Sequence, residues 1–127
     1  MLTSAKFSYL VAGLCALVVL IIPSIAWGKR IPPKPVTPVV FNDVEYSAGG
    51  DGKVGWIVAT DTTTKSELWT AKVFRIHTHW WKGEEDNQWV FISYLKLEPN
   101  ALFIKDERSR CYRLDLNTRR VKRDYCH

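Results

Sequence analysis

Short apolar segments separated by turn residues fill the chain from residue 39 to its end, and this alternation restricts the fold more than any other feature. The segments are rich in β-branched and aromatic residues, which fit a pleated, half-buried surface better than a helix. We expect strands at residues 39–46, 54–60, 68–77, 89–97, 102–105, 111–116 and 121–125. Short strands at this spacing are typical of an antiparallel meander in an all-β domain.

A glycine-rich stretch, residues 48–52, follows the first expected strand. A phosphate-binding loop needs a helix N-terminus after it to form the anion site. A strand pattern follows here instead, so we interpret the stretch as a hairpin turn.

The N-terminus has the layout of an export signal: a short polar start, an apolar run over residues 7–22, and then small residues. Cleavage after Ala26 fits this pattern. The alternative is an uncleaved anchor, because the apolar span up to Trp27 is long enough to cross a bilayer and because Lys29 and Arg30 put positive charge directly after the cleavage site. We therefore expect a periplasmic or extracellular protein, either released or tethered by an N-terminal hydrophobic helix.

Proline and basic residues dominate the next segment, which predicts an extended spacer of polyproline type. The chain then divides into a signal peptide or membrane anchor (residues 1–26), a Pro-rich linker (27–38) and a β domain (39–127). About 90 residues suffice for an independent fold with a modest core. We expect that core to contain the aromatic residues Trp56, Trp69, Phe74, Trp89, Phe91, Tyr94 and Phe103.

Two turn segments of the domain resemble each other. Residues 59–65 read Ala-Thr-Asp-Thr-Thr-Thr-Lys, and residues 113–119 read Arg-Leu-Asp-Leu-Asn-Thr-Arg. In each, an Asp leaves a strand, a Thr follows three positions later, and a cation comes next. An Asp in this place can accept backbone N–H bonds within the turn, and the Thr hydroxyl can brace its far side. The offset of about 50 residues lies in the range of one propeller blade.

The first of these segments resembles the repeat of pyrroloquinoline-quinone-type β-propellers, Ala-x-Asp-x-x-Thr-Gly-x-x-x-Trp. The residues that match the repeat are Ala59, Asp61, Thr64 and Trp69, and Leu68 fits as well. Lys65 stands where the family has Gly, and Arg123 stands at the Trp position of the second segment.

This resemblance implies a small exported bacterial-type protein with one or two blade-like units. It concerns architecture, and because no quinone-binding residues match, it implies no cofactor. Two such units cannot close a propeller, which typically needs at least four blades. We expect an antiparallel meander of two blade-like sheets packed as a small sandwich or open barrel, or completed by oligomerisation.

Cys111 and Cys126 remain once Cys15 of the apolar run is set aside. In a small exported domain such a pair predicts a disulfide. Closing a loop of about 15 residues stabilises the fold by roughly 3 kcal/mol in the chain-entropy model.

Two strand registers are compatible with this bond. Pairing Leu116 with Val121 sets the two cysteines opposite each other and places two opposite-charge pairs beside them. The blade resemblance favours a tighter turn that pairs Asp115 with Arg120, and this register leaves the cysteines diagonal and too far apart to bridge without a bulge. We predict the first register.

Trp80 and Trp81 precede an acidic loop, and they either pack within the loop or form an exposed platform for a sugar ring or a partner's apolar side chain. The net charge of +5 includes a C-terminal group of cations: Arg119, Arg120, Lys122 and Arg123. These form either a solvated face or a stripe that binds an anionic polymer or an envelope protein. We expect no nucleic-acid partner, because the protein is expected to be exported.

His77 and His79 lie two positions apart on an expected strand, which puts both imidazoles on the same side. Together with His127 or an acid of residues 84–86 they could ligate zinc or copper; otherwise they are surface residues. We find no Ser in a nucleophile elbow and no other catalytic constellation. The sequence therefore predicts a non-catalytic binding or scaffolding module of the cell envelope, with a metal-binding protein as the alternative.

Overall fold

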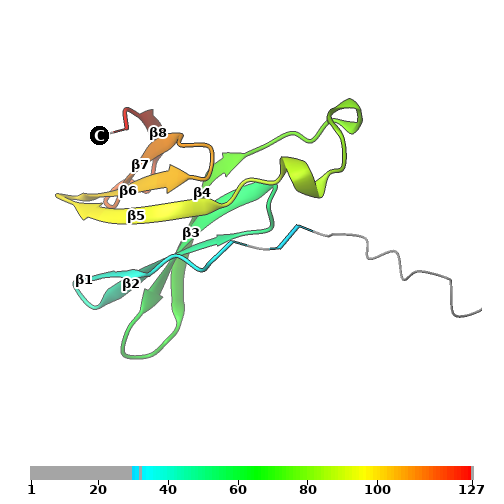
Figure 1. The fold of residues 1–127 in the computed structure, drawn as a ribbon. Helices are drawn as coiled ribbons and strands as arrows, with labels where there is room; N and C mark the ends of the chain where they lie inside the picture. Colours follow the sequence, from blue (N-terminus) through cyan, green and yellow to red (C-terminus); the bar gives the residue numbers. More distant parts are fainter. Residues whose placement is uncertain (1–29, 32, 127) are drawn as a thin grey trace, which may run out of the picture.

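The computed structural model describes residues 30–31 and 33–126, which form two four-stranded antiparallel sheets (Figure 1). The first sheet contains β1 (Val39–Phe41), β2 (Val44–Gly50), β3 (Val54–Asp61) and β4 (Glu67–Arg75), in that order. The second sheet contains β5 (Ile92–Glu98), β6 (Ala101–Asp106), β7 (Cys111–Asp115) and β8 (Val121–Asp124), also in that order. The expected all-β class is confirmed, and the two hydrogen-bonded ladders do not join into a closed sheet.

The expected N-terminal helix falls on residues outside those described. Within the described part of the chain, the helical segments are single 3₁₀ turns, and none has the length and apolar character needed to cross a membrane.

The first expected strand, residues 39–46, is wrong as a single strand, because it is a hairpin of β1 and β2. Asn42 and Asp43 at its turn have φ angles of 49° and 60°, and Phe41 pairs with Val44. Two consecutive residues with positive φ are typical of the two-residue type I′ hairpin turn, which accepts Asn and Asp. The hairpin prediction for the glycine-rich stretch is confirmed, since β2 pairs with β3.

A single hydrophobic core joins the two sheets. Along β3, Ile57 and Ala59 point into this core and are fully buried, as the two-residue period of a strand requires. The second sheet contributes fully buried aliphatic side chains, which are Leu102, Ile104 and Leu114. The Phe74 ring of β4 stacks on Tyr112 of β7, with 5.5 Å between the ring centroids.

The prediction that aromatic residues build the core is largely wrong. Among those expected, only Phe74 and Phe103 are buried, whereas Tyr94 is 47% exposed and the rest are half-buried. Trp56 lies on the outer face of β3 because it precedes the inward-facing Ile57, and its indole packs against Gly49. The core consists mainly of branched aliphatic side chains, together with Tyr46, Phe74 and Tyr112.

The two similar turn segments adopt the same structure. The Asp61 carboxylate accepts the backbone N–H groups of Thr63 and Thr64 at 2.8 and 3.0 Å. The Asp115 carboxylate accepts those of Asn117 and Thr118 at 2.8 and 2.9 Å. In both turns the Thr hydroxyl accepts a backbone N–H from the far side, at 3.4 Å. The predicted roles of Asp and Thr in these turns are therefore confirmed.

The position after the Thr adopts a left-handed conformation in both turns. Lys65 and Arg119 each have φ of 61°. This is the conformation that favours glycine, and glycine is the residue that the propeller repeat has at this position. Each backbone N–H of these two residues donates to the carbonyl of the turn Asp, at 2.9 and 2.7 Å.

The predicted disulfide is present, but the predicted register is wrong. Cys111 and Cys126 are bonded, with 5.4 Å between their Cα atoms. β7 and β8 pair Leu114 with Val121 and Cys111 with Asp124, and the Asp115 N–H donates to the carbonyl of Arg120. The carboxylate-capped turn thus selects the tighter register. The bond still forms because β8 ends at Asp124, so the last residues leave the ladder and return toward Cys111.

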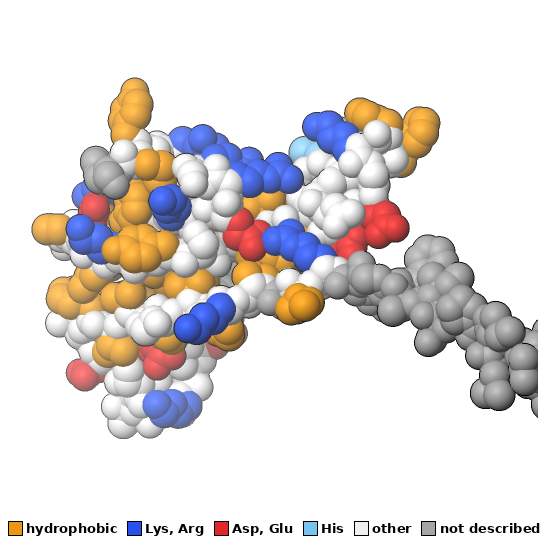
Figure 2. Space-filling view, viewed as in Figure 1, with side chains coloured by type: hydrophobic (Ala, Val, Ile, Leu, Met, Phe, Trp, Pro, Cys, Tyr) orange, Lys and Arg blue, Asp and Glu red, His pale blue; other side chains and the backbone are white. Residues whose placement is uncertain are grey.

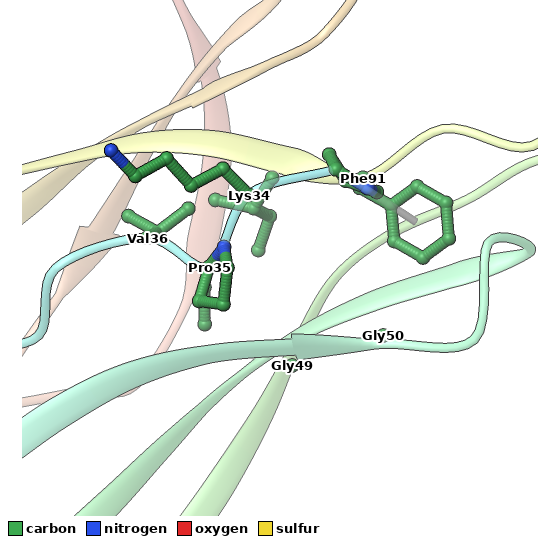
Figure 3. A pocket seen from close by; sticks show the side chains of 9 residues that line it. Lys34, Pro35, Val36, Gly49, Gly50 and Phe91 are labelled. Carbon is green, nitrogen blue, oxygen red and sulfur yellow. The ribbon is translucent and has the colours of Figure 1, made fainter. Parts of the chain in front are cut away.

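Residues 33–36, within the predicted linker, lie between the two sheets (Figure 3). Together with Gly49, Gly50 and Phe91 they line a cleft of about 220 Å³ between β2 and the start of β5. Val36 also packs against the core. This part of the Pro-rich segment is therefore in contact with the β domain.

Candidate binding surface on the loop between the two sheets

A long loop, residues 76–91, connects β4 to β5 and projects beyond both sheets (Figure 1). It contains two 3₁₀ turns, η1 (Trp80–Lys82) and η2 (Asp86–Gln88). The loop carries both expected aromatic residues, both expected histidines and the acidic run. The predicted aromatic and histidine residues therefore lie on one loop, whereas the predicted cations lie near β8.

The Gln88 side chain closes the neck of this loop. Its Oε1 accepts the His79 N–H at 2.7 Å, and its Nε2 donates to the His79 carbonyl at 2.8 Å and to the Gly83 carbonyl at 3.3 Å. Gln88 is buried, so each of these bonds satisfies a polar group that would otherwise be desolvated. The tip is thereby held as a closed loop with a fixed backbone path.

The β2–β3 turn supports the base of the loop on both arms. The Ile76 N–H donates to the Lys53 carbonyl and the Val90 N–H donates to the Gly52 carbonyl, both at 2.8 Å. Gly52 has φ of 93°, and a Cβ at this position would lie 2.5 Å from the Trp89 ring. Only glycine combines this conformation with so close an approach, so Gly52 lets Trp89 cover the turn.

Arg30 holds the start of the described chain against the same base. Its guanidinium donates to the Trp89 carbonyl and to Glu107 Oε2, the latter at 2.6 Å, and lies 5.3 Å from the centroid of the Phe91 ring. The Arg30 backbone N–H donates to Asp86 at 3.2 Å. Arg30 therefore meets the β domain at the foot of the loop.

The tip of the loop presents two indole rings to solvent. Trp80 is 88% exposed and Trp81 is 63% exposed, and they contact each other edge to face with 5.9 Å between ring centroids. The His79 ring stacks on Trp81 at 4.4 Å. In Figure 2 this aromatic tip stands away from the rest of the surface, next to basic and histidine side chains. Both indoles are therefore exposed and not packed into the loop, whereas their binding to a sugar ring or to a partner's side chain stays a prediction.

The charges of the loop are divided between tip and base. Glu85 forms an ion pair with Lys53, and Asp86 accepts the Arg30 N–H, so both acids face the base. Lys82 is the last residue of η1, directly beside the indoles. The tip is therefore mainly aromatic, with charged groups at its edge.

The histidines do not share a strand, because β4 ends at Arg75 and both lie in the loop. The prediction that strand geometry aligns them is wrong for this reason. His79 is stacked on Trp81, and no group of three or more His, Cys, Asp or Glu that could hold a metal occurs among the described residues. His127, the third ligand considered, lies outside them, so a metal site that includes it stays a prediction.

The C-terminal cations are not brought together on one face. Arg119 lies over the Trp69 ring at 5.2 Å, and Arg123 lies over the Tyr112 ring at 5.3 Å. Arg120 and Lys122 point the other way and line a groove of about 320 Å³ with Arg113. Two of the four predicted cations therefore stabilise aromatic packing, and two line a polar groove.

The shifted pKa values belong to groups that support the fold. Burial raises the pKa of Tyr46, and burial together with the nearby Asp106 raises that of Tyr112. Backbone N–H bonds hold the pKa values of Asp51, Asp61 and Asp115 below their usual range. All of these groups lie outside the 76–91 loop, and their shifted pKa values follow from burial and from hydrogen bonds within the turns.

Sequence reasoning missed three residues that position this surface: Arg30, Gly52 and Gln88. A lone Gln or Arg in a loop carries no pattern that marks its partners. Gly52 was recognised as a turn residue, but its contact with Trp89 joins distant parts of the chain.

A comparison with models of known protein families finds no match, and a search among curated proteins finds no significant relative. The geometry of the loop is therefore the basis for assigning a function.

Proposed function

We propose that the protein is an exported, non-catalytic binding module of the cell envelope that contacts its partner through Trp80 and Trp81. The observation that carries this proposal is the exposure of both indoles on a loop whose neck and base are fixed. Leaving apolar surface in water forgoes about 25 cal/mol per Å² of burial energy. Exposed apolar patches rimmed by polar groups mark interaction sites, and Trp is enriched among the residues that dominate binding energy.

The fixed loop backbone supports the same function. The hydrogen bonds of Gln88 at the neck and of the Gly52 carbonyl at the base support the loop without any partner. Ordering a loop on binding costs free energy, so a loop that is already ordered binds more tightly with the same contacts. The side chains that bind are thus placed by residues that do not touch the partner.

Two features support export. Residues 7–22 form an apolar run after a short polar start, as in a secretory signal or anchor. The bond between Cys111 and Cys126 is of a kind that persists in oxidising compartments. The twin capped turns further support the view that the two sheets are blade-like units packed as a small sandwich.

Site-specific photocrosslinking in cells that express the full chain tests the contact. A photoreactive phenylalanine derivative at position 81 is expected to give covalent adducts with an envelope molecule. The matched control is the same derivative at position 125, since Tyr125 is also aromatic and 87% exposed. It directly follows β8, which lies away from the 76–91 loop in Figure 1. Adducts at position 81 that do not exceed those at position 125 would refute the proposed function.

A further inference from the structure

We infer that the partner of this tip is a lipid bilayer, with Trp80 and Trp81 seated at the level of the headgroups. This inference rests on the proposed function and names the partner. It takes the apolar N-terminal segment as retained, so that the same membrane holds the chain and receives the loop.

The place where the described chain begins supports this partner. Arg30 is fixed at the foot of the loop by Trp89, Asp86 and Glu107. Residues 27–29 precede it, and the apolar span ends at Trp27. Three residues extend over at most about 10 Å. A retained apolar span therefore keeps the foot of the loop within about that reach of the bilayer surface.

The chemistry of the tip fits the interfacial region of a bilayer. Indole rings are enriched at the boundary between headgroups and acyl chains, where their apolar body and polar N–H are both satisfied. Lys82, beside the indoles, can extend its ammonium to headgroup phosphates while its methylenes stay near the apolar region. Glu84 balances this charge, so the proposal depends on the indoles and does not require anionic lipids.

Because the apolar span holds the chain at the bilayer, two indoles are sufficient to keep the tip of the loop bound there. A short linker turns the second contact into an intramolecular step, with an effective concentration on the order of millimolar. A tip that binds weakly as an isolated group then stays seated on the bilayer for much of the time. The membrane-bound tip and the hydrogen bonds of Arg30 to the foot of the loop would together fix the orientation of both sheets relative to the membrane.

The test uses the full chain in nanodiscs of phosphatidylcholine with brominated acyl chains, which quench indole emission at short range. Trp80 and Trp81 are two of the six tryptophans of the chain. If they are seated at the headgroups, the double variant Trp80→Phe/Trp81→Phe loses their quenched emission. The quenched fraction then falls to the part that Trp27, at the end of the retained apolar span, still contributes. Both side chains are exposed, so the variant is expected to fold, and formation of the Cys111–Cys126 bond checks this.

The matched control is Trp56→Phe, which removes a half-buried indole on the first sheet. Removing an unquenched indole leaves the quenched fraction unchanged or raises it. A double variant that behaves like Trp56→Phe would overturn the lipid inference. If the adducts at position 81 are then found on a protein or a glycan, the proposed function stands and only the lipid partner is rejected.

Discussion

The first and second sheets have the same strand order and the same capped turn before the last strand, but they differ in strand length. β3 and β4 have 8 and 9 residues, whereas β7 and β8 have 5 and 4. The second sheet alone, within the described chain, contains a disulfide and a buried carboxylate. The short β7–β8 ladder is therefore supported by a covalent bond and a polar network. The longer β3–β4 ladder is stabilised by more backbone hydrogen bonds and by burial of apolar side chains.

The turns after β2 and after β6 show this difference at equivalent places. Asp51 is exposed, and its carboxylate accepts the N–H groups of Lys53 and Val54, both at 2.9 Å. Asp106 is buried, and its carboxylate accepts two turn N–H groups and also Arg110 Nε at 2.7 Å and the Tyr112 hydroxyl at 3.1 Å. The same residue type is thus a turn cap in one sheet and the centre of a network in the other.

The largest effect is expected from Asp106→Ala. This change leaves the Arg110 guanidinium and two backbone N–H groups without their acceptor. Removing one partner of a buried ion pair costs about 3–5 kcal/mol. Because the Arg110 side chain is 30% exposed, we expect a loss of about 3 kcal/mol in the free energy of unfolding, measured by urea denaturation.

Asp51→Ala is the matched control for that experiment. Its carboxylate caps an exposed turn, so the loss should be clearly smaller than for Asp106→Ala. Equal losses would show that the buried network adds nothing beyond a turn cap, and the contrast between the sheets would then rest on the disulfide alone.

A comparable effect is expected from replacing both Cys111 and Cys126 by Ala. A closed loop with a sequence separation of 15 predicts a loss of roughly 3 kcal/mol in the free energy of unfolding. Amide hydrogen exchange locates the loss. Because losing the bond lowers the global free energy of unfolding, amides in both sheets should exchange faster. The amides of β8 should be accelerated more than those of β4, the equivalent strand of the first sheet. Equal acceleration in both strands would mean that the bond stabilises the whole fold and not the short ladder.

The sequence predicts the strand boundaries well where the turns contain a recognisable pattern of turn residues, and poorly where the turns lack one. The Asp turns at Asp61 and Asp115 were predictable because one carboxylate can cap two N–H groups within a few residues. The β1–β2 hairpin was missed because its turn consists of only Asn42 and Asp43, without glycine. Hydrogen bonding within a turn can therefore be predicted from sequence. In the β7–β8 hairpin the capped turn determines the register, and the register predicted from the cysteine pair is not the one observed.

The candidate surface was predictable only in part. Two adjacent tryptophans next to acidic residues identify a candidate platform, but exposure depends on which other side chains fill the core. Here the core is formed by the two sheets, and Trp80 and Trp81 lie on the loop that projects beyond them, so both indoles stay exposed. The hydrogen bonds of Arg30 join residues far apart in sequence, and those of Gln88 at the neck of the loop follow no local sequence pattern. Both sets of contacts are therefore visible only in the three-dimensional structure.

The smallest effect is expected from pH, and it tests whether the two capped turns are equivalent. Backbone N–H bonds hold the pKa values of Asp61 and Asp115 below their usual range. A carboxyl group with a lowered folded-state pKa stabilises the fold above its unfolded pKa of about 3.9 and loses this contribution as the pH falls through the folded value. Stability should therefore be constant near neutral pH and decrease below about pH 4, as thermal melting across that range would measure.

Asp61→Asn and Asp115→Asn separate the two contributions, because Asn keeps a hydrogen-bond acceptor but does not titrate in this range. Each variant should lose a similar share of the acid-induced decrease. Salt should reduce the share of Asp115 slightly more, since Lys122 also lowers the pKa of Asp115 after the backbone N–H groups of Thr118 and Asn117. If only one variant flattens the pH dependence, the two turns share a geometry but not a role in stability.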